Sequence, residues 1–467
     1  MEWKDVAPQD GANSQSLSGG LPVTTVTQFL AAEMHDTRWA DIPEIAREAA
    51  RRLLVDQVGI TFMGAAFTGS ALHAYAAALG GAPDALLFGT TLRVPSEVAA
   101  GINAQVCRNT NFEESGPGYH IGPLCVHVAL AVGQQYDRSG AEILAAIATG
   151  YMHSVRFHAA RRADKGSPHL RTVGAAIAAK LMGLSAEQIA TAMSLAWESP
   201  FRNHSFPIFA PPPTAKRISP IGMQMLYHAR AGVQAATMIR VGFPSLRDEV
   251  DRVVAAEYDA GVLTGPAPWQ GVNDQMELKP WVSSRHCQAA LQAIWELQQQ
   301  RTIDPRAVTA VRLKLSAMYL RPHQWEPAPN VFFEAIYSTQ WAVSMLLQQL
   351  PPGPKWVTAE RLADPFSRAL ASKVTITEDV ASTTAYGNLR PHDVNGIVEI
   401  DVGGETLHAR TTMGQVYGSG HKPMPDAMQE QKFMEATSLN LPEKKARDLL
   451  AALRGFEEVG SVGEVVG

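Results

Sequence analysis

Cysteine is scarce in this sequence. Only Cys107, Cys125 and Cys287 occur among 467 residues, and no two of them form a CxxC pair. Disulfide scaffolds need several closely spaced cysteines, and zinc or iron–sulfur centres often use clustered thiolates. The spacing therefore argues against a disulfide framework and against a metal centre built on cysteine.

An excess of basic charge is also missing. The chain has 40 Lys and Arg against 45 Asp and Glu, which gives a formal net charge of −5. No surplus of cations exists to neutralise a phosphate backbone, so we expect no nucleic-acid partner. A local cationic pocket inside an acidic shell remains compatible with an anionic substrate.

No run of 18 apolar residues occurs, so we expect no membrane span and no membrane partner. Residues 1–5 lack the apolar core of a signal peptide, which favours a cytoplasmic location. GxGxxG after a strand, the P-loop, HExxH and GxSxG are absent, which lowers the expectation for nucleotide-dependent, zinc-protease and α/β-hydrolase chemistry. We expect no cofactor and no metal.

Helical signals dominate what is present. The chain is too long for one ordinary core, so two domains are expected. From residue 25 to about 275 amphipathic and alanine-rich stretches follow one another, with capping-box patterns at Asp41, Ser139 and Ser185. Residues 6–22 are rich in Gly, Ser, Asn and Pro, and we predict disorder over residues 1–22.

The pattern changes near residue 306. Val311, Leu313 and Leu315 alternate with charged residues, which predicts a half-buried strand. Residues 373–377 and 398–402 repeat this period, and the Gly-Gly pair at 403–404 predicts a hairpin turn into 406–411. One amphipathic helix is predicted at 331–347, and further helices at 427–438 and 442–454.

The predicted fold class is therefore mainly α, with a large all-α helical domain and a smaller α+β domain. The predicted bounds are 23–275 for the helical domain and 276–411 for the α+β domain. Residues 412–467 are predicted to form C-terminal helices that return to the helical domain.

Several segments combine loop signals with cationic, imidazole or hydroxyl side chains. They are residues 111–120, 166–169, 214–217 and 279–287, together with Tyr319 at the end of the first predicted strand. Each has an ordinary alternative: a solvated acidic turn, a surface histidine, a basic surface pair, a solvated basic linker and a packed tyrosine. Taken singly, none of them establishes a site.

Their order along the chain resembles the MmgE/PrpD family, which includes 2-methylcitrate dehydratase and cis-aconitate decarboxylase. The resemblance covers about residues 25–455 and rests on order and spacing rather than on one motif. Its signatures are the polar loop 111–120, Gly-Tyr at 150–151, a loop histidine before the Gly-Ala-Ala helix, Thr-x-Lys-Arg at 214–217, Gly-Phe-Pro at 242–244, and Lys-Pro with Ser-Arg-His at 279–286.

The resemblance implies a homodimer in which the α+β domain acts as a lid domain and the active site lies in the cleft between the two domains. The catalytic residues that it implies are His120, His169, Lys216, His286 and Tyr319. The substrate-binding residues that it implies or makes candidates are Asn111, Ser115, Lys279 and Arg285.

These residue types suit acid–base chemistry on a carboxylate. Removal of water from a β-hydroxy acid needs a base near the α-hydrogen and an acid near the leaving hydroxyl, and histidine can do either job. Lys216, with Lys279 and Arg285, would hold carboxylates and offset the charge of an enolate-like intermediate. Tyr319 would donate a hydrogen bond or a proton.

The chain departs from the family at the start of the polar loop. The family usually has Asp-Phe-Asp-Asp-Thr, whereas this chain has Asn-Phe-Glu-Glu-Ser at 111–115. Asparagine cannot act as a carboxylate base. Either Glu113 or Glu114 takes over the acidic role, or the reaction needs no carboxylate at this position.

We therefore predict a metal-free lyase, a dehydratase or decarboxylase, that acts on a small di- or tricarboxylate. One alternative is a cofactor-independent isomerase or epimerase of a similar acid on the same scaffold. The other is a catalytically inactive binding homologue, which Asn111 favours.

Overall fold

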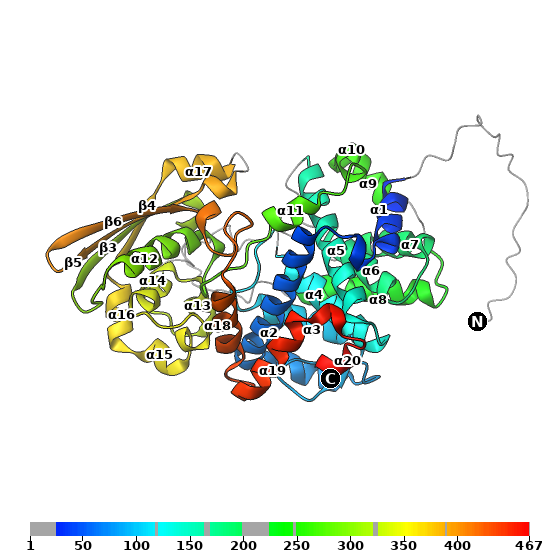
Figure 1. Ribbon diagram of the computed structural model, residues 1–467, viewed down its shortest axis with the longest axis horizontal. Helices are drawn as coiled ribbons and strands as arrows, with labels where there is room; N and C mark the ends of the chain where they lie inside the picture. The colour runs from blue at the N-terminus through cyan, green and yellow to red at the C-terminus, as the bar shows by residue number, and fades with distance from the viewer. Residues whose placement is uncertain are drawn as a thin grey trace, which may run out of the picture.

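The computed structural model describes residues 25–116, 120–162, 169–198, 224–245, 249–320, 326–387 and 390–466. The segment 1–22, predicted to be disordered, lies outside these ranges. The fold is mainly α, with a large helical domain and a smaller domain built on a four-stranded sheet (Figure 1). This confirms the predicted fold class, while the exact domain bounds stay a prediction.

The helical domain is built almost entirely of helices. Its elements are α1 (Val26–Asp36), η1 (Trp39–Asp41), α2 (Glu44–Leu79), β1 (Ala85–Leu86), β2 (Arg93–Val94), α3 (Ser96–Arg108), α4 (Gly122–Gln135), α5 (Gly140–Ala160), α6 (His169–Leu181), α7 (Ala186–Trp197), α8 (Gln224–Arg240), α9 (Glu249–Glu257), α10 (Ala260–Leu263) and α11 (Trp269–Asp274). The two short strands β1 and β2 are the only strands among its described residues.

Two of the three predicted capping boxes are confirmed. The Ser139 and Ser185 hydroxyls accept from the backbone N–H three residues on, and start α5 and α7. The prediction at Asp41 is wrong, because Ile42 and Pro43 are extended and α2 begins only at Glu44. The Asp41 carboxylate instead accepts from the Arg38 N–H and caps the short helix η1.

The smaller domain, called the lid domain below after the role that the resemblance implies, packs helices against one face of a mixed sheet. Its elements are η2 (Arg285–Cys287), α12 (Gln288–Gln300), β3 (Val308–Leu315), η3 (Ala317–Tyr319), α13 (Phe332–Tyr337), α14 (Thr339–Leu347), η5 (Pro354–Trp356), α15 (Ala359–Ala363), α16 (Pro365–Ala371), β4 (Val374–Glu378), α17 (Val380–Gly387), η6 (Pro391–Asp393), β5 (Asn395–Val402) and β6 (Glu405–Thr412). The strand order is β4-β3-β5-β6, parallel between β3 and β4 and antiparallel elsewhere.

The predicted strands and hairpin are present. Gly403 and Gly404 adopt φ values of 60° and 86°, a conformation that side chains disfavour, and join β5 to β6. The prediction of one continuous helix at 331–347 is wrong, because two helices, α13 and α14, occupy this segment. Ser338 is extended between α13 and α14, and its hydroxyl accepts from the Trp341 N–H and starts the second helix.

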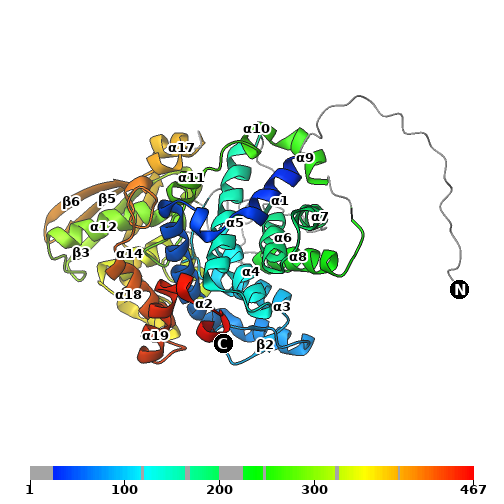
Figure 2. The same cartoon turned by 45° about the vertical axis from the view of Figure 1, so that its right-hand side comes forward.

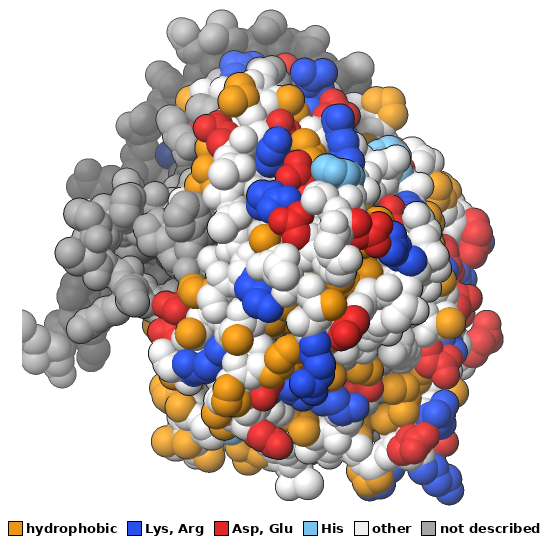
Figure 3. Space-filling view, turned by 90° about the vertical axis from the view of Figure 1, so that its left-hand side faces the viewer, with side chains coloured by type: hydrophobic (Ala, Val, Ile, Leu, Met, Phe, Trp, Pro, Cys, Tyr) orange, Lys and Arg blue, Asp and Glu red, His pale blue; other side chains and the backbone are white. Residues whose placement is uncertain are grey.

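The sheet has one covered face and one polar face. Helices α12 and α14 pack against it, and the buried residues of β3 alternate with more exposed ones. On the other face Arg312 pairs with Glu399 and Asp401 of β5. Figure 3 shows acidic and basic side chains interspersed over the described surface at this end of the molecule.

After the sheet the chain returns to the helical domain, through η7 (Met413–Gln415), α18 (Asp426–Thr437), α19 (Glu443–Arg454), η8 (Phe456–Glu458) and α20 (Gly463–Val466). Helices α18 and α19 both pack on α2 (Figures 1 and 2). Phe433, Leu450, Leu453 and Phe456 are buried in the core of the helical domain. No described helix combines the length and the apolar character needed to cross a bilayer.

The core of the lid domain is completed by the helical domain. Ile60 and Met63 of α2, Cys107 of α3, Phe112 and Ala436 of α18 are buried in the same cluster as the sheet residues. The two domains therefore share an apolar contact. This contact holds the residues at the junction of the domains in place.

Candidate active site

The loop that follows α3 is buried rather than solvated. Asn111, Phe112, Glu113, Glu114 and Ser115 are each at most 4% exposed. The Phe112 ring anchors the loop in the lid core. The Asn111 backbone has a φ of 52°, a left-handed conformation that asparagine tolerates better than most residues.

Three cationic or imidazole side chains surround the Glu113 carboxylate. Its Oε1 lies 2.7 Å from the Arg108 Nη1, 2.8 Å from the His120 Nδ1 and 3.6 Å from the Lys279 Nζ. Burial alone would raise the pKa of this carboxyl, but Lys279, Arg108 and His120 together hold it below its usual range. Glu113 is therefore ionised across the physiological range of pH.

The His120 ring is held in one tautomer. Its Nδ1 lies 2.8 Å from Glu113 Oε1 and 2.8 Å from the carbonyl oxygen of Glu114. Both are acceptors, so Nδ1 carries the proton. Burial, with help from Arg108, lowers the pKa of His120 to about 4, so the ring is neutral at pH 7. Its Nε2 then holds a lone pair and can accept a proton.

Glu114 has the opposite character from its neighbour. Its Oε1 lies 2.6 Å from the Tyr151 hydroxyl, and its Oε2 accepts from the Gly122 N–H at 2.9 Å. None of the described cations is paired with it, and burial together with the nearby Glu113 and Glu277 charges raises its pKa to about 8. Glu114 is mainly protonated at neutral pH.

Lys279 links the loop to the segment that enters the lid domain. Its Nζ donates to the Asn111 backbone oxygen at 3.0 Å and to the Asn111 Oδ1 at 3.1 Å. The Asn111 amide in turn donates to the carbonyl of Ile336 at 2.8 Å. Burial lowers the pKa of Lys279 to about 8, although Glu113 opposes this.

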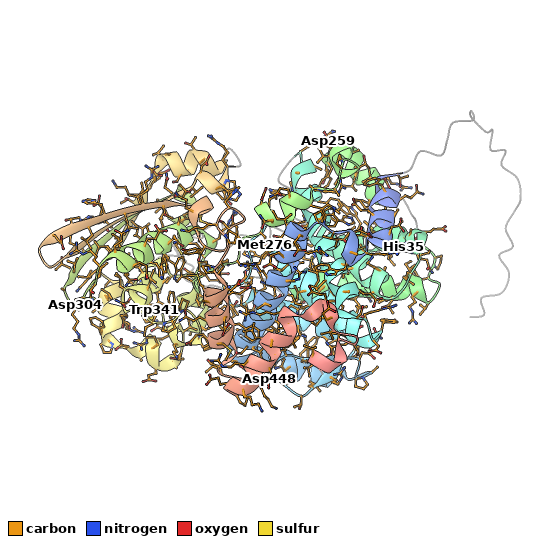
Figure 4. All side chains as sticks on the ribbon, viewed as in Figure 1. His35, Asp259, Met276, Asp304, Trp341 and Asp448 are labelled. Atoms are coloured by element: carbon orange, nitrogen blue, oxygen red, sulfur yellow. The ribbon has the colours of Figure 1, made fainter. Side chains whose placement is uncertain are left out.

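A second ion pair follows in the same segment. The Arg285 Nε and Nη2 donate to the two carboxylate oxygens of Glu277 at 2.5 and 2.6 Å. The Glu277 carbonyl accepts from the Ser115 N–H at 2.8 Å, which joins this pair to the loop. Met276, the preceding residue, lies where the two domains meet in Figure 4. Glu277, Lys279, Arg285, Gln288, Tyr417 and Ser419 are among the residues that line a small hollow here.

The structure therefore brings Asn111, Ser115, His120, Lys279 and Arg285 into one connected region. Tyr319 is 2% exposed and lies near Arg285 and Glu277, whose charges act on its hydroxyl.

Of the other three predicted catalytic residues, His169 is the one whose side chain the structure describes. His169 lies at the start of α6, with its Nε2 3.3 Å from the Ser154 hydroxyl and its ring stacked on Phe157. Ser154 stands three residues after Tyr151 on α5, so the hydrogen-bond partners of His169 and of Glu114 lie about one turn apart on the same helix. Lys216 lies outside the described residues. His286 belongs to η2, but its side chain is also outside what the structure describes.

Several residues of this region were not predicted from the sequence. Arg108 ends a helix and gives no loop signal, and Glu277 stands two residues before the candidate segment 279–287. Tyr151 stood in a family signature without a role. Lys432 of α18 and Asp56 of α2 form a buried pair with a nitrogen–oxygen distance of 2.6 Å, and their helical patterns give no sign of it.

No group of three or more His, Cys, Asp and Glu side chains within the described ranges has the arrangement of a metal site. The chain matches the MmgE/PrpD N-terminal domain over residues 28–251 and the MmgE/PrpD C-terminal domain over residues 281–458. A search of curated proteins found no match.

Proposed function

The chain belongs to the MmgE/PrpD family of generally lyase-type enzymes, and from this premise we propose that it removes water or CO2 from a small di- or tricarboxylate. The observation that carries the proposal is the tautomer of His120. With Nδ1 held between Glu113 and the Glu114 carbonyl, the neutral ring offers Nε2 as a general base.

The acidic role left open by Asn111 falls to Glu113 in this proposal. Its carboxylate lies within hydrogen-bond distance of His120, so it stabilises the imidazolium formed when the base takes a proton. Glu114 is held protonated by burial and is unsuited to that task. The asparagine at 111 therefore does not leave the site without a carboxylate, which speaks against an inactive binding homologue.

Cations and a tyrosine complete the proposed machinery. Arg285 uses Nε and Nη2 on Glu277, which leaves its Nη1 for a substrate carboxylate at the hollow that it lines. Lys279 offsets negative charge on an enolate-like intermediate, and Tyr319 supplies a proton or a hydrogen bond. His169, Lys216 and His286 remain in the proposal as further catalytic residues, and the assembly is proposed to be a homodimer.

The test is proton NMR of the EDTA-treated protein in D2O with citrate, 2-methylcitrate, cis-aconitate and aspartate-like acids. A new alkene signal or loss of CO2 supports a lyase and names its substrate class. Deuterium exchange without net conversion supports the isomerase instead. No change with any acid would contradict both reactions for this substrate class.

A further inference from the structure

The Lys432 ammonium is buried where α18 meets α2 and the site loop, and three protein oxygens lie within 3.1 Å of its Nζ. Its Nζ lies 2.6 Å from the Asp56 Oδ1, 2.7 Å from the Lys279 carbonyl oxygen and 3.1 Å from the Phe112 carbonyl oxygen. The Nζ also lies 4.1 Å from the centre of the Phe112 ring. With its side chain only 4% exposed, the ammonium is enclosed by protein groups.

The two carbonyls belong to the segments that carry the proposed chemistry. The Phe112 carbonyl stands in the peptide bond that leads to Glu113, and the Lys279 carbonyl belongs to the residue whose Nζ pairs with Glu113 at 3.6 Å. Lys279 in turn bonds the Asn111 backbone oxygen. Besides the Ser115–Glu277 hydrogen bond, the loop 111–115 and the segment 277–285 are thus joined through the Lys279 side chain and through Lys432.

The position of Lys432 is itself fixed by the packing of α18 on α2. A Cβ at Gly59 would lie 2.7 Å from the Phe433 ring, so only glycine allows this approach. Asp56 lies three residues before Gly59, on a neighbouring part of the helix surface. Close packing at Gly59 therefore places the adjacent Lys432 against Asp56.

We propose that Lys432 is a positioning residue of the reaction, which holds loop residues 111–113 and Lys279 at the separation where Glu113 and Lys279 pair. This inference rests on the proposed function. Because its ammonium is buried and donates to the Phe112 and Lys279 carbonyls, Lys432 acts through these peptide groups and not on the substrate.

The test removes the pair without leaving a lone buried charge. Lys432→Met alone leaves Asp56 unpaired and is expected to unfold more easily, so Asp56→Asn/Lys432→Met is the informative variant. Its thermal stability is expected to return toward that of the wild type. Its kcat is expected to stay lower by up to ~100-fold with little change in KM, since small displacements of catalytic groups have effects of this size.

The crystal structure of the double variant gives a readout that does not depend on turnover. We expect the distance between Glu113 Oε1 and Lys279 Nζ to exceed its present 3.6 Å. Asp426→Asn is the matched control, because it removes an exposed contact between the same two helices, the Arg52–Asp426 pair, and should leave kcat unchanged.

Recovery of both stability and kcat in the double variant, with an unchanged Glu113–Lys279 distance, would overturn the inference. If the double variant does not fold, Lys432→Gln, which keeps N–H donors without the charge, is measured in the same way. Wild-type protein inert toward every carboxylate would instead refute the proposed function. The crystallographic distance would still decide whether Lys432 sets the loop geometry.

Discussion

At the scale of single residues, the site depends on which atoms carry protons. For His120→Asn we expect a loss of turnover of about 10²–10⁴-fold, because the amide N–H can replace Nδ1–H but nothing replaces Nε2. Steady-state turnover of the acid identified by NMR, with circular dichroism to establish folding, measures this.

His408→Asn is the matched comparison for His120→Asn and should leave turnover unchanged. It makes the same replacement at an exposed histidine of β6 and leaves the His120 cluster intact. A folded His120→Asn protein with wild-type turnover would remove this histidine from the mechanism.

Glu114 should make the folded protein less stable as the pH rises, which is the opposite of the usual effect of a carboxylate. Burial raises its pKa from 4.5 to about 8, so the folded chain holds a proton that the unfolded chain has lost. Its contribution is complete below pH 4.5 and is lost as the pH rises to 8. Relative to Glu114→Gln, which mimics the protonated acid, the wild type should lose stability by up to about 1.4 kcal/mol per pH unit.

Urea unfolding of both proteins between pH 6.5 and 8 measures this difference. Burial lowers the pKa of His120 from 6.5 to about 4, so its own effect, stability lost as the pH falls below 6.5, lies outside that window. Parallel stability curves for the two proteins would show that Glu114 is ionised in the folded chain.

The sequence identified the polar loop but not the chemistry of its two glutamates. Glu113 and Glu114 are adjacent and of one type, so local pattern cannot separate them. Their protonation differs because one contacts Arg108 and Lys279 while the other contacts Tyr151 and the Gly122 N–H. Such partners come from tertiary contacts, which a single sequence does not display.

At the scale of helices and strands, glycine allows a close approach that positions the site. A Cβ at Gly64 of α2 would lie 1.9 Å from the Val106 carbonyl oxygen on α3, the helix that ends at Arg108. Backbone atoms cannot yield as a side chain can. We expect Gly64→Ala to destabilise the protein by about 1–3 kcal/mol and to reduce turnover by shifting α3.

Chemical denaturation measures the Gly64→Ala effect, with Gly387→Ala as its control. Gly387 ends α17, and a Cβ there meets no atom within 4 Å, so that variant should be neutral or slightly stabilised. Equal free energies of unfolding for the two variants would mean that α2 and α3 can move apart without loss of stability.

Helices and strands that follow a local sequence pattern could be predicted from the sequence. Their exact ends, and the burial of the loops between them, could not. The alternation at 311–315 and the glycines at 403–404 gave the strands and the hairpin, because burial of one sheet face imposes a period of two. The break at Ser338 and the start of α2 at Glu44 depend on individual backbone conformations. The burial of loop 111–115 depends on two domains closing over it, and its polar composition was also compatible with a solvated turn.

At the scale of the whole molecule, the core around the sheet is not independent of the helical domain. Ile60, Met63, Cys107, Phe112 and Ala436 complete the apolar cluster around the sheet. A fragment of residues 276–411 lacks all five, and we expect it to remain without fixed tertiary packing.

Near-UV circular dichroism and amide NMR dispersion of this fragment, compared with the full chain, measure that expectation. A cooperative thermal transition in the isolated fragment would show instead that the sheet and its helices are self-sufficient.

The pairing of Asp56 with Lys432 has a consequence for biosynthesis. Asp56 is translated 376 residues before its partner Lys432. At ~5–20 residues per second, the ribosome needs on the order of 20–75 s to span that gap. Throughout this time a nascent helical domain lacks both the cation that pairs with Asp56 and the helix α18 that packs over it. The contacts through which Lys432 joins the loop to Lys279 can form only after α18 has been translated.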